Sequence, residues 1–252
     1  MAIRKPDDRE AEPDGSRPAA KAVLTAAKAA GDTRGVALVL HGGRADSFEA
    51  VRGLHLSPAR MLPFAQALRK QGGPHGLAVW TLRNRYRGWN GEDMSPVQDA
   101  RWALAQISRE HPGVPVYLLG HSMGGLTALS VADHPQVEAV VALAPWLSTA
   151  TRVDPVAGRR ILIVHGTEDR WTSPGSSLAY ARRAQGVAGS VDYVALKGAG
   201  HFMLRRLGLW NSLGSGFILG AFGKVTGTEV PGAADALCTL LAASGARLPL
   251  VL

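Results

Sequence analysis

Short apolar runs alternate with amphipathic segments along most of this chain. The apolar runs stop at glycine, histidine or charged residues, as buried strands do. They begin near Val36, Leu77, Val116, Val137, Arg160 and Val191. Between them, apolar positions at helical spacing predict helices over residues 58–70, 96–110, 123–133 and 174–185. Because strands alternate with helices, we expect an α/β fold: a doubly wound, mainly parallel sheet of about six strands with helices on both faces.

The N-terminal part of the chain does not follow this alternation. Residues 1–20 are dominated by Pro, Asp, Arg and Gly, which bury little apolar surface, and we expect them to be disordered. Residues 21–30 are rich in alanine and predict a short helix. The rest of the chain, 21–252, has a length that suits a single domain.

The C-terminal part contains an apolar, glycine-rich segment at 207–223. One interpretation is that this segment packs on the sheet or forms a dimer contact, and we favour it. The alternative is a surface that contacts acyl chains or a membrane. A closing helix is expected over 233–243, with the single cysteine, Cys238, as a small buried apolar residue.

The most informative motif is Gly120-His121-Ser122-Met123-Gly124, which fits the pattern G-x-S-x-G. An apolar run precedes it and a helical pattern follows it. A strand must therefore stop, turn sharply and start a helix at Ser122, which exposes the hydroxyl above the sheet. The alternative is an ordinary glycine-rich turn with a surface serine.

A serine hydroxyl needs a base, and the base needs an orienting acid. Glu168 and Asp169 follow the predicted strand at 160–166, and His201 follows the one at 191–196. Carboxyl ends of parallel strands share one edge of the sheet, so these groups can meet Ser122 there.

A third strand end carries His41-Gly42-Gly43. The backbone N–H of Gly43, or of Arg44 if the turn is shifted, can pair with that of Met123 to form an oxyanion hole. We expect His41 to hold this turn rather than to act as a base.

Together these motifs resemble the α/β-hydrolase superfamily, in particular its small bacterial esterases, lysophospholipases and dienelactone-hydrolase-like members. The resemblance covers residues 36–201. It implies Ser122 as nucleophile, His201 as base and Asp169 as orienting acid. The family pattern His-Gly-x-x-Asp-x-x-Val-x-Pro selects Asp169 over Glu168, although Thr172 stands in place of the valine.

Two intervals refine the picture that the resemblance implies. Relatives often insert a cap between the strands that here end at 143 and begin at 160, but residues 144–159 are too few for a helical lid. We therefore expect minimal or no cap. Near this edge, four residues are possible substrate contacts, although the two tryptophans equally suit simple packing. They are Arg44, Trp89, His121 and Trp146.

Composition narrows the function classes. The net charge of +8 indicates either solvated basic surface or attraction to an anionic surface or acidic substrate. No nucleic-acid module, phosphate loop, dinucleotide motif or metal-ligand spacing occurs, so no cofactor or metal is expected. The sequence also lacks a secretory signal and an apolar run of membrane-spanning length. We expect a cytoplasmic monomer or homodimer, with transient lipid-surface contact at most.

The resulting functional hypothesis is a serine hydrolase that cleaves carboxylic esters of small acyl substrates through an acyl-enzyme, as a carboxylesterase or lysophospholipase-like enzyme. An acyltransferase or thioesterase would use the same three residues. A non-catalytic binding protein on a hydrolase scaffold is a further alternative, although such proteins usually lose one of these groups.

Overall fold

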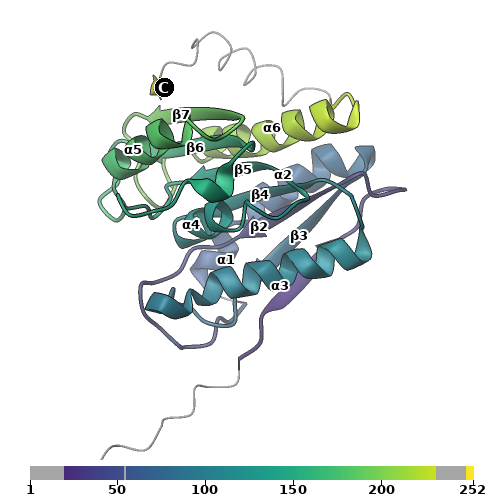
Figure 1. The fold of residues 1–252 in the computed structure, drawn as a ribbon, viewed down its shortest axis with the longest axis horizontal. Helices are drawn as coiled ribbons and strands as arrows, with labels where there is room; N and C mark the ends of the chain where they lie inside the picture. The colour runs from purple at the N-terminus through teal and green to yellow at the C-terminus, as the bar shows by residue number, and fades with distance from the viewer. Residues whose placement is uncertain (1–19, 54, 231–247) are drawn as a thin grey trace, which may run out of the picture.

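The computed structural model describes residues 20–53, 55–230 and 248–252. Within them lies one eight-stranded sheet, in the order β1-β3-β2-β4-β5-β6-β7-β8 (Figure 1). All six predicted strands are present and run parallel to one another. They are β2 (Gly35–Leu40), β3 (Leu77–Arg83), β4 (Val116–His121), β5 (Val137–Leu143), β6 (Arg160–Gly166) and β7 (Ser190–Leu196). The doubly wound, mainly parallel fold is therefore confirmed.

Two further strands extend the sheet at its edges. At one edge, β1 (Val23–Ala27) pairs antiparallel with β3, and at the other β8 (Leu250–Val251) pairs parallel with β7. The short helix predicted over 21–30 is therefore wrong. The free edge of β3 offers backbone partners to the whole of β1, and Leu24 packs against the core. These gains exceed the small intrinsic preference of alanine for a helix.

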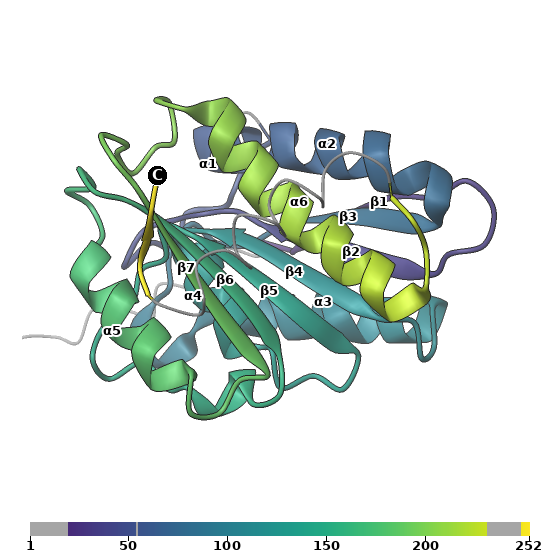
Figure 2. The same cartoon turned by 90° about the horizontal axis from the view of Figure 1, so that it is seen from above.

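Helices cover both faces of the sheet, as expected (Figure 2). The helices α3 (Ser95–Glu110), α4 (Met123–Ser130) and α5 (Pro174–Ala184) pack on one face, and α2 (Leu62–Gly72) and α6 (Leu207–Thr226) on the other. Neighbouring residues of β2 illustrate the two cores: Leu38 faces the first and Val39 the second. The single helix predicted over 58–70 is interrupted at Met61, giving the short α1 (Leu56–Arg60) before α2.

The apolar segment 207–223 lies within α6. Its large side chains Trp210, Phe217, Ile218 and Phe222 are buried against the sheet, so the packing interpretation describes this segment. Glycine lets the helix lie close to the strands: a Cβ on Gly35 would collide with the Phe222 ring. The helix expected over 233–243, Cys238 and residues 1–19 lie outside the described residues. None of the helices in the described ranges combines the length and apolar character needed to cross a bilayer.

Candidate active site

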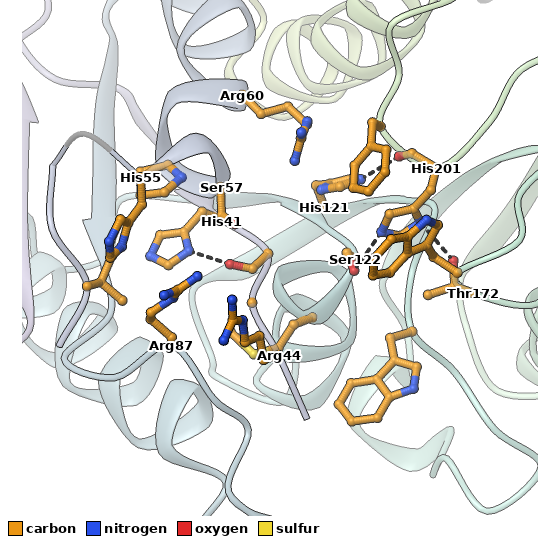
Figure 3. A pocket seen from close by; sticks show the side chains of 18 of the residues that line it. His41, Arg44, His55, Ser57, Arg60, Arg87, His121, Ser122, Thr172 and His201 are labelled. Atoms are coloured by element: carbon orange, nitrogen blue, oxygen red, sulfur yellow. Dashed lines mark hydrogen bonds between the residues drawn. The ribbon is translucent and has the colours of Figure 1, made fainter. Parts of the chain in front are cut away.

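Ser122 lies on a sharp turn between β4 and α4. Its backbone adopts φ 55° and ψ −118°, a region that side-chain-bearing residues rarely occupy. Two glycines make the turn possible. A Cβ on Gly120 would overlap the carbonyl oxygen of Gly124, and a Cβ on Gly124 would overlap that of Leu40. The turn presents the Ser122 side chain to a pocket at the carboxyl edge of the sheet (Figure 3).

Three side chains from three strand ends form a hydrogen-bonded chain. His201, which follows β7, places Nε2 3.1 Å from the Ser122 Oγ. Its Nδ1 lies 2.8 Å from Oδ2 of Asp169, which follows β6. All three residues are buried. The structure therefore brings together the serine, imidazole and carboxylate that the sequence singled out.

The Asp169 carboxylate is the centre of a larger network. Oδ1 accepts hydrogen bonds from the backbone N–H groups of Trp171 and Thr172, at 2.8 and 2.9 Å. Oδ2 accepts hydrogen bonds from His201 Nδ1, from the Thr172 hydroxyl at 2.9 Å and from His165 Nε2 at 3.1 Å. Burial acts to raise the pKa of Asp169, but the hydrogen bonds from His165, His201 and the backbone outweigh it and hold the pKa well below its usual range. The group is therefore a carboxylate throughout the neutral range.

The adjacent Glu168 has a different environment. Its side chain is exposed and forms an ion pair with Arg205 at 3.3 Å. The geometry thus distinguishes two acids that are neighbours in sequence.

His165 has a contact that sequence reasoning missed. This side chain is fully buried, with Nε2 on Asp169 and Nδ1 2.7 Å from the Ser177 hydroxyl. Ser177 lies 3.0 Å from the Tyr193 hydroxyl, so the network continues into the core. The spacing of four residues between His165 and Asp169 was the available signal, because both flank the turn that ends β6.

The candidate oxyanion donors, Gly43 and Met123, line the same pocket as Ser122. Met123 is the first residue of α4, so its N–H has no acceptor within the helix. In the described part of the chain, no hydrogen bond uses the N–H of Gly43, whereas that of Arg44 donates to the Arg87 carbonyl at 2.8 Å. The backbone N–H of Arg44 is therefore already hydrogen-bonded, which favours Gly43 as the candidate donor. A Cβ at position 43 would collide with Arg87 and with the Met123 side chain, which explains the glycine.

His41 is buried beneath this turn, as expected for a structural role. Its Nε2 accepts the Asn84 N–H at 3.1 Å, so Nδ1 carries the proton and donates to the Gly42 carbonyl at 2.7 Å. Burial lowers the pKa of His41 to about 4. The ring is therefore neutral and already occupied by hydrogen bonds to the backbone.

His121 is the second neutral imidazole near the serine. Burial, together with the nearby His201 and Arg60, lowers its pKa to about 3. Nε2 lies 2.9 Å from the His201 carbonyl and donates to it. Among the described residues, Nδ1 has no hydrogen-bond partner, and it lies beside Gly42 at the pocket wall.

A cavity of about 610 Å³ opens over Ser122. Three of the four predicted substrate contacts line it, namely Arg44, His121 and Trp146. Trp89 does not: it packs edge-to-face on Trp146 at 6.3 Å and lines a neighbouring cavity. The structure thus gives Trp89 the packing role that the sequence equally allowed, although the same loop brings Arg87 to the pocket over Ser122.

The pocket also contains residues that sequence reasoning did not select. They include His55, Ser57, Arg60, Arg87, Trp171 and Phe202. Between β5 and β6, residues 144–159 contain only a short 3-10 helix at Asp154–Val156, so this interval places no helical lid over the opening.

Comparison with known proteins supports the fold. The family model described as serine aminopeptidase, S33, matches residues 75–160, about a third of the chain. No curated protein matches the sequence significantly. A putative α/β hydrolase of unknown function from Agrobacterium tumefaciens superposes with a TM-score of 0.64 at 16% identity, covering 83% of this chain and 94% of that one.

Two further solved structures are similar. An α/β serine hydrolase without a lid from Xanthomonas campestris has a TM-score of 0.55 at 16% identity, covering 84% of this chain and 90% of that one. An esterase from Pyrococcus furiosus has a TM-score of 0.57 at 16% identity, covering 77% and 81%. At sequence identities this low, the structural similarity shows a shared fold.

Proposed function

Since this chain has the fold of the α/β-hydrolase superfamily, and the resemblance seen in its motifs holds, we propose that it is a serine hydrolase that cleaves carboxylic esters. The observation that carries this proposal is the hydrogen-bonded chain from Ser122 through His201 to Asp169, with the serine on a strained turn that faces a pocket. This arrangement supplies a nucleophile, a base and an orienting anion.

The reaction follows from the positions of these groups. His201 Nε2 takes the proton of Ser122 as Oγ attacks the ester carbonyl carbon. The backbone N–H groups of Gly43 and Met123 hold the resulting oxyanion. The carbon–oxygen bond to the leaving alcohol then breaks, and His201 returns the proton to that alcohol. Water, deprotonated by His201, attacks the acyl-enzyme, and Ser122 recovers its proton as the carboxylic acid leaves.

Asp169 keeps this base in one orientation. Its carboxylate accepts the Nδ1 proton of His201, which leaves Nε2 free to accept from Ser122. The same negative charge stabilises the imidazolium that forms during attack. The hydrogen bonds that hold Asp169 ionised therefore support the base indirectly.

Transfer of the acyl group to another alcohol, or cleavage of a thioester, would use the same residues. The pocket favours water as the acceptor, because the 144–159 interval contributes no helical lid that would screen an acyl-enzyme from solvent. A purely binding protein is disfavoured, since none of the groups needed for the reaction is missing.

The test is covalent labelling with a fluorophosphonate probe, combined with turnover of a neutral 4-nitrophenyl ester. We expect labelling at Ser122 and turnover of the ester. The Ser122→Ala variant should lose the label and lower kcat by on the order of 10⁴-fold or more. Ser130→Ala, in the same helix but away from the pocket, is the matched control. A folded protein that neither reacts with the probe nor hydrolyses esters would refute the proposal.

A further inference from the structure

The pocket over Ser122 is strongly positive. Three arginines line it, Arg44, Arg60 and Arg87, whereas no aspartate or glutamate occurs among the described residues that line it. Asp169 is hydrogen-bonded to His201, and its carboxylate also accepts hydrogen bonds from His165 and from two backbone N–H groups. Positive charge at the opening is therefore not balanced from within the pocket.

Only one of the three arginines has an acidic partner. Arg87 forms an ion pair with Glu49 at 2.6 Å. In the described part of the chain, neither the Arg44 nor the Arg60 guanidinium has a hydrogen bond or ion pair with a carboxylate. The positive charge of Arg44 also contributes to lowering the pKa of Glu49, but that carboxylate is already hydrogen-bonded to Arg87.

Arg60 is the more informative of the two unpaired residues. It ends the short helix α1, is half-buried, and lies 4.8 Å from the centre of the Phe202 ring. Phe202 directly follows His201, so this contact holds the cation at the wall of the active site. A half-buried guanidinium without a carboxylate partner is available to bind an anionic ligand.

The two arginines line the same pocket. In Figure 3, Arg60 lies on one side of the pocket and Arg44 on the opposite side, with His121 and Ser122 between these two levels of the view. Arg44 follows Gly43, the candidate oxyanion donor. A ligand whose carbonyl lies at Ser122 can thus place a second polar group between two cations.

We propose that the pocket selects esters that carry an additional anionic group, a carboxylate or a phosphate, held by Arg60 and Arg44. The planar guanidinium matches both anions with paired N–H donors. The net charge of +8 favours the approach of such substrates. This inference rests on the proposed ester hydrolysis and specifies its substrate class.

The first experiment compares matched substrates. We measure kcat/KM for 4-nitrophenyl monoadipate against its neutral methyl diester, and for 4-nitrophenyl 3-phosphonopropanoate against its neutral dimethyl phosphonate. We expect at least a tenfold preference for one or both charged esters, and a decline of that preference as salt is added. The two pairs distinguish a carboxylate from a phosphate-like ligand.

The variants Arg60→Gln and Arg44→Gln should each lower the charged-to-neutral ratio about tenfold, in line with a charge-assisted hydrogen bond. Arg60→Lys should retain part of the preference. Arg182→Gln, which removes an exposed arginine of α5 that lies outside the pocket, should leave the ratio unchanged. A ratio that is near one in the native protein, or that survives both pocket variants, would overturn the anionic substrate class while leaving ester hydrolysis intact.

A binding measurement separates this inference from the catalytic proposal. Calorimetric titration of adipate and of glycerol phosphate into the Ser122→Ala protein should show binding of at least one, weakened by Arg60→Gln and not by Arg182→Gln. If no ester is hydrolysed, the function proposed above fails, and this titration still decides the anion site. The absence of binding by both anions would overturn it.

Discussion

Asp169 and Glu168 are neighbouring acids that the fold treats differently, and this difference is testable. Asp169 is buried and bonded to His201, whereas Glu168 is exposed and paired with Arg205. Asp169→Asn should lower kcat for ester hydrolysis by on the order of 10⁴-fold, because the amide favours the tautomer of His201 in which Nε2 carries the proton and cannot accept that of Ser122. Glu168→Gln, an identical chemical change one residue away, should leave kcat within about twofold. The reverse ranking in steady-state assays would show that the acid is wrongly assigned.

His165 is the second residue whose role can be isolated. It acts on the reaction only through Asp169, so we class it as a positioning residue. His165→Phe leaves Oδ2 without one donor, and kcat should fall about tenfold to a hundredfold, in line with the loss of a hydrogen bond to a charged group. His165→Gln keeps a donor and should recover part of that loss. Equal kcat values in the two variants at matched thermal stability would contradict a positioning role.

The sequence predicts some site residues well and others not at all. Ser122, Asp169 and His201 each follow an apolar strand directly, so the topology of a parallel sheet brings them to one edge. Arg60 gives no such signal, because its place depends on where a five-residue helix packs relative to Phe202. Trp89 illustrates the same limit: its loop is near the right edge, but the direction of the side chain depends on tertiary packing.

At the scale of elements, strands with continuous apolar runs were predictable and the edges of the sheet were not. β2 and β4 are buried along their whole length, which favours the apolar runs 36–40 and 116–119. β1 is half-exposed and rich in alanine, so its sequence suits a helix equally well. Only the unpaired edge of β3, a feature of the assembled sheet, decides its structure.

The helix α6 provides a prediction about packing. Phe217 and Ile218 are buried in the core between α6 and the sheet, so Phe217→Ala and Ile218→Ala should each lower the free energy of unfolding by about 2–5 kcal/mol. The preference among esters of different acyl length should not change, because neither residue lines the pocket over Ser122.

Leu207→Ala, at a 40% exposed position at the start of the same helix, is the control and should have little effect on unfolding. Denaturant titration and a chain-length series of 4-nitrophenyl esters check both expectations. An altered chain-length preference with unchanged stability would instead assign α6 to substrate contact.

At the scale of the whole molecule, the two buried neutral histidines predict sensitivity to acid. The pKa values of His41 and His121 are lowered to about 4 and about 3, whereas in the unfolded chain both rings take up protons near the ordinary imidazole pKa of 6.5. Between pH 6.5 and 4 the unfolded state therefore binds more protons than the folded state, and stability falls as the pH falls. Each ring contributes up to about 1.4 kcal/mol per pH unit.

Urea titrations at pH 7, 6 and 5 measure this dependence. His41→Gln removes one titrating group, so its stability should decline less steeply with acid than that of the native protein, even if the variant is weaker at pH 7. Parallel declines in the two proteins would show that His41 does not contribute.

The strained backbone at Ser122 serves the proposed reaction but lowers the stability of the fold. A backbone at φ 55° and ψ −118° suits glycine better than serine and costs roughly 1–3 kcal/mol. Ser122→Gly should therefore abolish hydrolysis and raise the melting temperature, whereas Ser122→Ala should abolish hydrolysis without that gain. In a lineage released from the need for catalysis, selection for stability alone would favour glycine at this position. A serine at this strained position is what the catalytic role proposed above requires, since stability alone favours glycine there.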